Sequence, residues 1–265
     1  MRRGQMIWGV VLLLIGALML LNAMGVRLPG GMSPMELFWP VVLILAGAWV
    51  LLGVTMRGKA ETEQASVSLQ GAHEAKLKIS HGAGELKIHS GAGPGELARG
   101  SFAGGLDQKA NLTGDRLEVR MRPARDVLVF PFFGPTQQLD WDVALNADVP
   151  LTLTLSSGAD RSVLDLRDLN ITDLKVETGA SDTKVTLPAR GRLNADFDLG
   201  AASLDVIVPD GVSAQIRASI GAADLNVDQA RFPRVGGVYK SPDFETATNA
   251  VDITIDAGAA GIKVR

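Results

Sequence analysis

The sequence contains no cysteine. This absence excludes disulfide bonds, thiolate metal ligands and a cysteine nucleophile, and it leaves the cellular compartment open. Aromatic residues make up only 5% of the chain, and three of the four tryptophans lie within the first fifty residues. The remaining chain therefore has few rings on which a sugar could stack, which argues against a carbohydrate-binding protein.

Basic side chains are scarce beyond residue 60. Five of the 26 basic and one of the 29 acidic side chains lie in residues 1–60, which leaves 21 and 28 for residues 61–265 and a net charge of −7 there. Proteins that bind nucleic acid contact its phosphates through clustered lysine and arginine. We therefore expect no nucleic-acid partner.

Two segments lack charge altogether, residues 6–24 and residues 37–56. A helix needs about 20 apolar residues to cross the hydrocarbon core of a bilayer, so both are long enough to span it. A signal peptide would have a shorter apolar core and a cleavage site, and no second span would follow at once. Residues 1–60 are therefore predicted to form a two-helix transmembrane hairpin in the cell membrane, in contact with lipid.

The basic residues of this hairpin predict its orientation. Arg2, Arg3, Arg57 and Lys59 lie outside the two spans, whereas the connection between the spans carries only Arg27. Cytoplasmic segments carry an excess of lysine and arginine. Both ends of the hairpin, and the domain that follows it, are therefore predicted to be cytoplasmic.

A Gly-Ala pair recurs every 21 residues in the second half of the chain, and its flanks repeat with it. Leu174 and Val176 precede one pair and Val185 follows it, for example, so apolar residues alternate on both sides. Alternation of this kind indicates half-buried strands, and the Gly-Ala pair indicates a corner between them. We expect glycine to supply the backbone angles of a sharp bend and alanine to point into a crowded angle. The predicted corners are Gly82, Ala83, Gly158, Ala159, Gly179, Ala180, Gly200, Ala201, Gly221, Ala222, Gly258 and Ala259.

The repeat predicts an all-β domain, a β-solenoid-like stack with coils of about 21 residues and two or three short strands per coil. It also predicts that Lys175, Asp196 and Arg217 lie on successive coils, as do Lys184 and Asp205. Opposite charges on adjacent strands attract. These residues are therefore interpreted as surface ion pairs, with a catalytic row of carboxylates as the alternative.

Two stretches interrupt the repeat and set the predicted domain boundaries. Residues 61–135 are interpreted as an N-terminal β-subdomain, and residues 136–265 as the solenoid, with an insert at about 229–250. The first part ends in the apolar segment VLVFPFFGP. Its side chains Phe130, Phe132 and Phe133 form either an exposed loop that touches the membrane or a partner, or a loop folded into the core.

Motifs for chemistry are missing. His73, His81 and His89 are eight residues apart and could share one face of an extended chain, but zinc needs three convergent ligands and glycine-rich turns interrupt this register. We therefore expect surface histidines and no metal. Asp160, Asp182 and Asp224 lie just past corner glycines, where aspartate commonly closes a turn with its own backbone. The sequence has no phosphate-binding loop, nucleophile elbow or zinc-protease helix, so we predict no enzyme and no cofactor.

Several segments resemble LiaF-like proteins, the cell-wall-active antibiotic response family of bacteria. The second apolar segment, with FWPV at residues 38–41 and LLG at 51–53, is similar to their membrane region. Residues 67–102, with AKLKISHGAGELKI and LARGSF, and residues 141–151 are similar to their toast-rack β-domain. The resemblance implies an accessory protein of envelope-stress signalling that acts on a sensor kinase or another stress component, and it implies no catalytic residues.

Three functions follow as hypotheses. The leading one is a membrane-anchored, non-enzymatic regulatory or scaffold protein whose β-domain binds a protein partner. The alternative is a structural envelope protein that associates with itself. A polysaccharide-modifying enzyme is the third.

Overall fold

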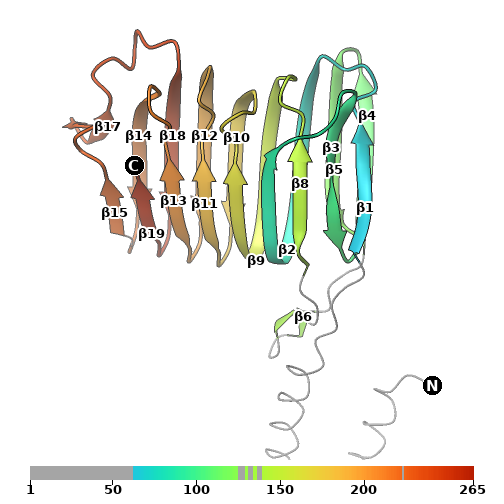
Figure 1. Cartoon of the computed structure of the whole chain (residues 1–265). Coiled ribbons are helices and arrows are strands. Elements are labelled where there is room, and N and C mark those ends of the chain that lie inside the picture. Colours follow the sequence, from blue (N-terminus) through green and yellow to red (C-terminus); the bar gives the residue numbers. More distant parts are fainter. Residues whose placement is uncertain (1–61, 125–128, 131–133, 136–138, 223) are drawn as a thin grey trace, which may run out of the picture. The chain divides into compact units, whose positions relative to one another are not determined.

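The computed structural model describes residues 62–124, 129–130, 134–135, 139–222 and 224–265. This part of the chain is all-β, as predicted (Figure 1). No helix within it is long and apolar enough to cross a membrane, and the two predicted spans lie outside the described residues. The strands are β1 (Thr62–Ser68), β2 (Glu74–Ser90), β3 (Glu96–Ala103), β4 (Leu106–Thr113), β5 (Arg116–Pro123), β6 (Val129–Phe130), β7 (Gly134–Pro135), β8 (Trp141–Leu145), β9 (Leu151–Asp165), β10 (Ile171–Thr178), β11 (Asp182–Thr186), β12 (Arg192–Leu199), β13 (Ser203–Ile207), β14 (Ser213–Ile220), β15 (Asp224–Val227), β16 (Arg234–Val235), β17 (Val238–Lys240), β18 (Ala250–Ala257) and β19 (Gly261–Val264).

Each coil contributes one strand to each of two layers. In the first layer β10 pairs in parallel with β9 and β12, and in the second β11 pairs in parallel with β9 and β13. Leu174 lies between Leu153 and Ala195, which are 21 residues before and after it. The sequence period is therefore the step from one coil to the next.

The core lies between the two layers. Because side chains alternate across a strand, every second residue points inward, and the whole-residue exposure is 0% for Leu153, Val176, Val185 and Val206. A stack of short coils has no other core, so each coil depends on its neighbours for burial.

The last coil is out of sequence order. Strand β18 pairs with β12 on one side and with β14 on the other, and β19 lies in the same way between β13 and β15. The C-terminal coil is thus inserted between two earlier coils. The predicted insert at 229–250 makes this possible, because it carries the chain back past the end of the stack and forms the β16–β17 hairpin against β14.

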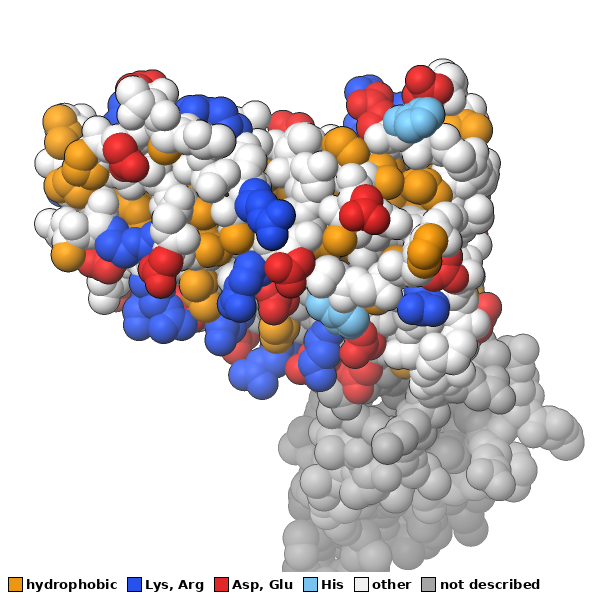
Figure 2. Space-filling model, turned by 45° about the horizontal axis from the view of Figure 1, so that its top comes forward, with side chains coloured by type: hydrophobic (Ala, Val, Ile, Leu, Met, Phe, Trp, Pro, Cys, Tyr) orange, Lys and Arg blue, Asp and Glu red, His pale blue; other side chains and the backbone are white. Residues whose placement is uncertain are grey.

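This insertion makes one predicted charge ladder wrong. Asp196 and Arg217 are not on adjacent strands, because both face Thr254 of the inserted β18. Arg217 instead binds Asp252 with Nη2 to Oδ1 at 2.8 Å. Charges of both signs are interspersed on the surface drawn in Figure 2, and exposed pairs of this kind contribute little to stability.

The N-terminal part closes one end of the stack. Strand β2 pairs with β9 along most of its length, so Gly82 and Gly158 lie on adjacent coils although they are 76 residues apart. The intervening chain extends both layers, with β5 and β4 on one and β8, β3 and β1 on the other. Trp141 and Phe102 fill this end, with ring centroids 5.0 Å apart in an edge-to-face contact.

Two short strands of the apolar segment before residue 136 are described, β6 and β7, and they pair with each other. Val129 and Phe130 of β6 pair with Pro135 and Gly134 of β7. The other two phenylalanines of the predicted interaction loop, Phe132 and Phe133, lie outside the described residues.

Candidate binding groove at the glycine corners

The corner glycines of neighbouring coils are in close contact. A Cβ atom at Gly200 would lie 2.6 Å from the carbonyl oxygen of Gly179, and one at Gly179 would lie 2.9 Å from that of Gly158. The same oxygens accept hydrogen bonds, from the amide of Ala201 at 2.8 Å and of Ala180 at 2.9 Å. Glycine is therefore needed at these two corners because the next coil occupies the space of a side chain.

The predicted reasons for the Gly-Ala pair were wrong. None of the six corner glycines has a φ in the left-handed region, so the bend does not use the special backbone freedom of glycine. The alanines are not crowded either, since all except Ala83 are exposed. The steric constraint lies on the glycine and comes from the adjacent coil.

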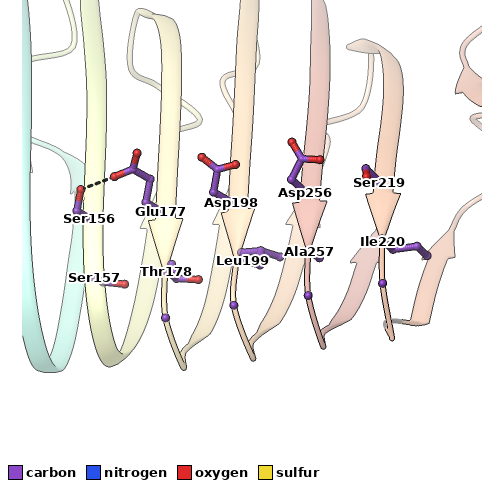
Figure 3. Close-up of a pocket in the computed structure, with 14 residues that line it drawn as sticks. Ser156, Ser157, Glu177, Thr178, Asp198, Leu199, Ser219, Ile220, Asp256 and Ala257 are labelled. Carbon is purple, nitrogen blue, oxygen red and sulfur yellow. Dashed lines mark hydrogen bonds between the residues drawn. The ribbon is translucent and has the colours of Figure 1, made fainter.

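A row without side chains leaves a hollow in the outer surface. The resulting groove has a volume of about 950 Å³ and crosses β9, β10, β12, β18 and β14. We call it the glycine groove; one wall is formed by the side chains two residues before each corner glycine (Figure 3). These side chains are Ser156, Glu177, Asp198, Asp256 and Ser219.

Three carboxylates lie side by side in this wall. Glu177 is paired in register with Asp198, and Asp198 with Asp256, on adjacent strands. Like charges directly opposite on neighbouring strands repel each other. Lys175 Nζ lies 2.8 Å from Glu177 Oε1 and 3.4 Å from Asp198 Oδ2, and thus offsets part of this repulsion.

Hydrogen bonds shift the pKa values of charged groups at the same wall. The hydrogen bond from Lys175 is the main cause of the lowered pKa of Glu177, and the one from the Ser156 hydroxyl at 2.9 Å is the second. The hydrogen bonds that Lys175 donates to Glu177 and Asp198 in turn raise the pKa of Lys175. Asp256 has no ion-pair partner among the described residues. The groove is therefore negatively charged at Asp256. These carboxylates were not predicted, although three of the six corner glycines have an acidic residue two positions before them in the sequence.

His81 is buried inside the first corner. Its Nε2 donates to the carbonyl oxygen of Leu139 at 2.7 Å, and its Nδ1 lies 3.2 Å from Asp160 Oδ2, with both side chains 0% exposed. The Ser162 hydroxyl donates to the same carboxylate oxygen at 2.9 Å. The prediction that His81 is a surface residue and that Asp160 closes a turn was wrong. The two residues bind each other across adjacent coils.

The other histidines bind different partners. His73 is exposed, 3.9 Å from Asp115. His89 Nδ1 donates to the carbonyl of Ser90 at 2.7 Å, and its Nε2 lies 2.8 Å from Asp142. The Ser90 carbonyl is the main cause of the raised pKa of His89, with Asp142 second among the raising contacts. Within the described ranges, no group of side chains is arranged to hold a metal ion.

The fold and the groove define a class, stacked-coil β-domains that present an open groove on their surface. Residues 56–207 match the family described as the N-terminal domain of toast_rack, DUF2154, and the chain belongs to this family. Residues 6–51 match the LiaI-LiaF-like transmembrane region. The protein is thus a LiaF-like toast-rack membrane protein, as the resemblance implied.

Of two similar solved structures, the first shares the fold. One, described provisionally as a cell adhesion protein from Clostridium sporogenes, is 22% identical, with a TM-score of 0.67 over 78% of this chain and 99% of that one. Another, described provisionally as an adhesin from Bacteroides fragilis, is 7% identical, with a TM-score of 0.22 over 79% and 100% of the two chains. The curated proteins contain no match.

Proposed function

We propose that the protein is a membrane-anchored, non-enzymatic regulatory or scaffold protein of cell-envelope stress signalling. The observation that carries this proposal is the presence of a toast-rack domain and a LiaI-LiaF-like transmembrane region in one chain. In this proposal residues 1–60 anchor the chain through two spans, residues 61–135 close the stack, and residues 136–265 supply the binding surface. The β-domain faces the cytoplasm, where it can reach a sensor kinase or another stress component.

The glycine groove is the proposed binding surface for that partner. It crosses five adjacent strands, which corresponds to about 19 Å at the usual strand spacing, or about six residues of extended chain. Its wall carries three carboxylates and one partly compensating lysine. A segment with two or three lysine or arginine residues in extended conformation fits this length and charge.

The alternative is a structural protein that associates with itself. Strand β15 at the end of the second layer pairs only with β19 within the described part of the chain, and an open strand edge can pair with another chain. A polysaccharide-modifying enzyme is less well supported, because the residues that line the groove include no aromatic side chain.

A stress-reporter assay in the host bacterium tests the proposal. The reporter is measured in the wild type, in a deletion strain, in a strain with Asp198→Asn and Asp256→Asn, and in a control strain with Asp210→Asn, which changes an exposed turn residue. We expect the deletion and the double variant to alter reporter induction alike, with the double variant still present in the membrane fraction, and the control to match the wild type.

The two negative results have different meanings. An unchanged reporter in the deletion strain would contradict a regulatory role. A changed reporter in the deletion strain with a normal one in the double variant would contradict the groove as the binding surface.

A further inference from the structure

A second hollow lies on the first layer, near the closed end of the stack. It has a volume of about 410 Å³ and is formed by β2, β4 and β5. Four cationic side chains and one anionic side chain line it, which gives a net charge of +3. These are Lys78, Lys109, Arg120, Arg122 and Asp107, and we call the hollow the basic hollow.

Three of these cations are aligned on adjacent strands. Arg120 of β5 is paired in register with Lys78 of β2 on one side and with Lys109 of β4 on the other. Residues directly opposite each other point to the same face of a sheet, and like charges there destabilise it. All three side chains are exposed, and a bound anion between them would offset this repulsion.

The carboxylates nearby offset this row only in part. The one that attracts Lys78 is Glu177, which already binds Lys175. Asp107 binds Arg122, with Oδ2 2.7 Å from Nη2, so that pair is neutral as a unit. Glu118, the next charged residue on the same face of β5, is in register with Lys76. Within the described residues, the three aligned cations form no ion pair with a carboxylate.

We infer that the basic hollow binds a phosphate group. A phosphate offers several terminal oxygens and up to two negative charges, and arginine and lysine together are its usual donors. Here the guanidinium of Arg120 lies between two ammonium groups, and the Ser80 hydroxyl also lines the hollow. The phosphate can belong to a soluble phosphate compound or to the headgroup of an anionic lipid.

The basic hollow shares no lining residue with the glycine groove. This inference therefore goes beyond the proposed function, and either can fail without the other. It concerns a ligand of the β-domain, whereas the groove concerns a protein partner.

Calorimetry on the full-length chain in a neutral detergent tests it with two probes. The first is inorganic phosphate, compared with chloride at equal ionic strength. The second is dihexanoyl phosphatidylglycerol below its micelle concentration, compared with dihexanoyl phosphatidylcholine. Binding of both probes identifies the phosphate group as the recognised feature. Binding of only the first identifies a soluble phosphate, and binding of only the second identifies a lipid headgroup.

Substitutions distinguish binding at the basic hollow from nonspecific electrostatic attraction between the probe and the protein. Lys78→Gln and Arg120→Gln each remove one direct contact to the anion and should weaken binding about tenfold. The matched control is Lys263→Gln, which removes an exposed cation on β19 that lines neither hollow and should leave affinity unchanged. Lys109→Gln should weaken binding while the melting temperature stays the same or rises, because it relieves repulsion within the row. Binding of neither probe, or an equal loss in the Lys263 variant, would overturn the inference.

Discussion

Replacing Gly200 by alanine tests the steric origin of the corner. The new Cβ would lie 2.6 Å from the carbonyl oxygen of Gly179, and both groups belong to backbone that cannot rotate away. Overpacking costs typically about 1–3 kcal/mol, and loss of the hydrogen bond from Ala201 to the same oxygen adds about 0.5–1.5 kcal/mol. We therefore expect Gly200→Ala to lower the free energy of unfolding by about 2–4 kcal/mol.

Gly82→Ala is the matched control. Gly82 is a corner glycine in the same sequence context, but a Cβ there meets nothing within 4 Å and its φ lies outside the left-handed region. Alanine at such a position restricts the unfolded chain and typically stabilises by about 0.4–1 kcal/mol. Melting of the full-length protein should show a decrease of about 4–16 °C for Gly200→Ala and no decrease for Gly82→Ala. Equal decreases would refute the steric explanation and restore the one based on backbone angles.

Three other changes test the interior and the surface. Ala201→Leu, at an exposed alanine, should change the free energy of unfolding by less than about 0.5 kcal/mol in urea denaturation, and a large loss would mean that the alanine is packed. His81→Leu removes the partner of the buried Asp160 carboxyl and should cost about 3–5 kcal/mol; a loss under 1 kcal/mol would mean that this pair does not hold the coils together. The raised pKa of His89 means that its contribution to stability is full below about pH 6.5 and is lost as the pH rises through the folded-state pKa. Melting temperatures measured from pH 5 to 9 should therefore decline less in His89→Gln than in the wild type, and parallel curves would exclude this contribution.

The stacking of coils could be predicted from sequence because period and alternation are local properties. The order of the coils in the stack could not be predicted in this way. The apolar residues Val251, Ile253 and Ile255 of β18 would fit beside β12 or at the end of the stack, and only the path of residues 229–249 decides between them. The burial of His81 could not be predicted from the sequence for a related reason. Strand β2 continues through the corner, so the turn that we expected to break its register is absent.

The basic hollow could be predicted from the sequence only in part. Lys109 and Arg120 lie on the two strands of a hairpin that turns at Gly114, with Thr113 opposite Arg116, and counting outward from that turn would have paired them. Lys78 joins them only through the parallel pairing of β2 with β5, for which the local sequence has no marker. A site that depends on such a long-range register is visible only in the folded protein.

The most direct test of the proposed function is photo-cross-linking from the glycine groove in living cells. A photoreactive amino acid is placed at Ser219, which lines the groove, or at Asp210 in an exposed turn outside it. We expect one membrane or cytoplasmic signalling protein to cross-link to Ser219 through a basic segment. This cross-link should be lost with Asp198→Asn and Asp256→Asn and absent from Asp210. Equal cross-linking from both positions, or cross-links from Ser219 only to a second copy of this chain, would contradict it.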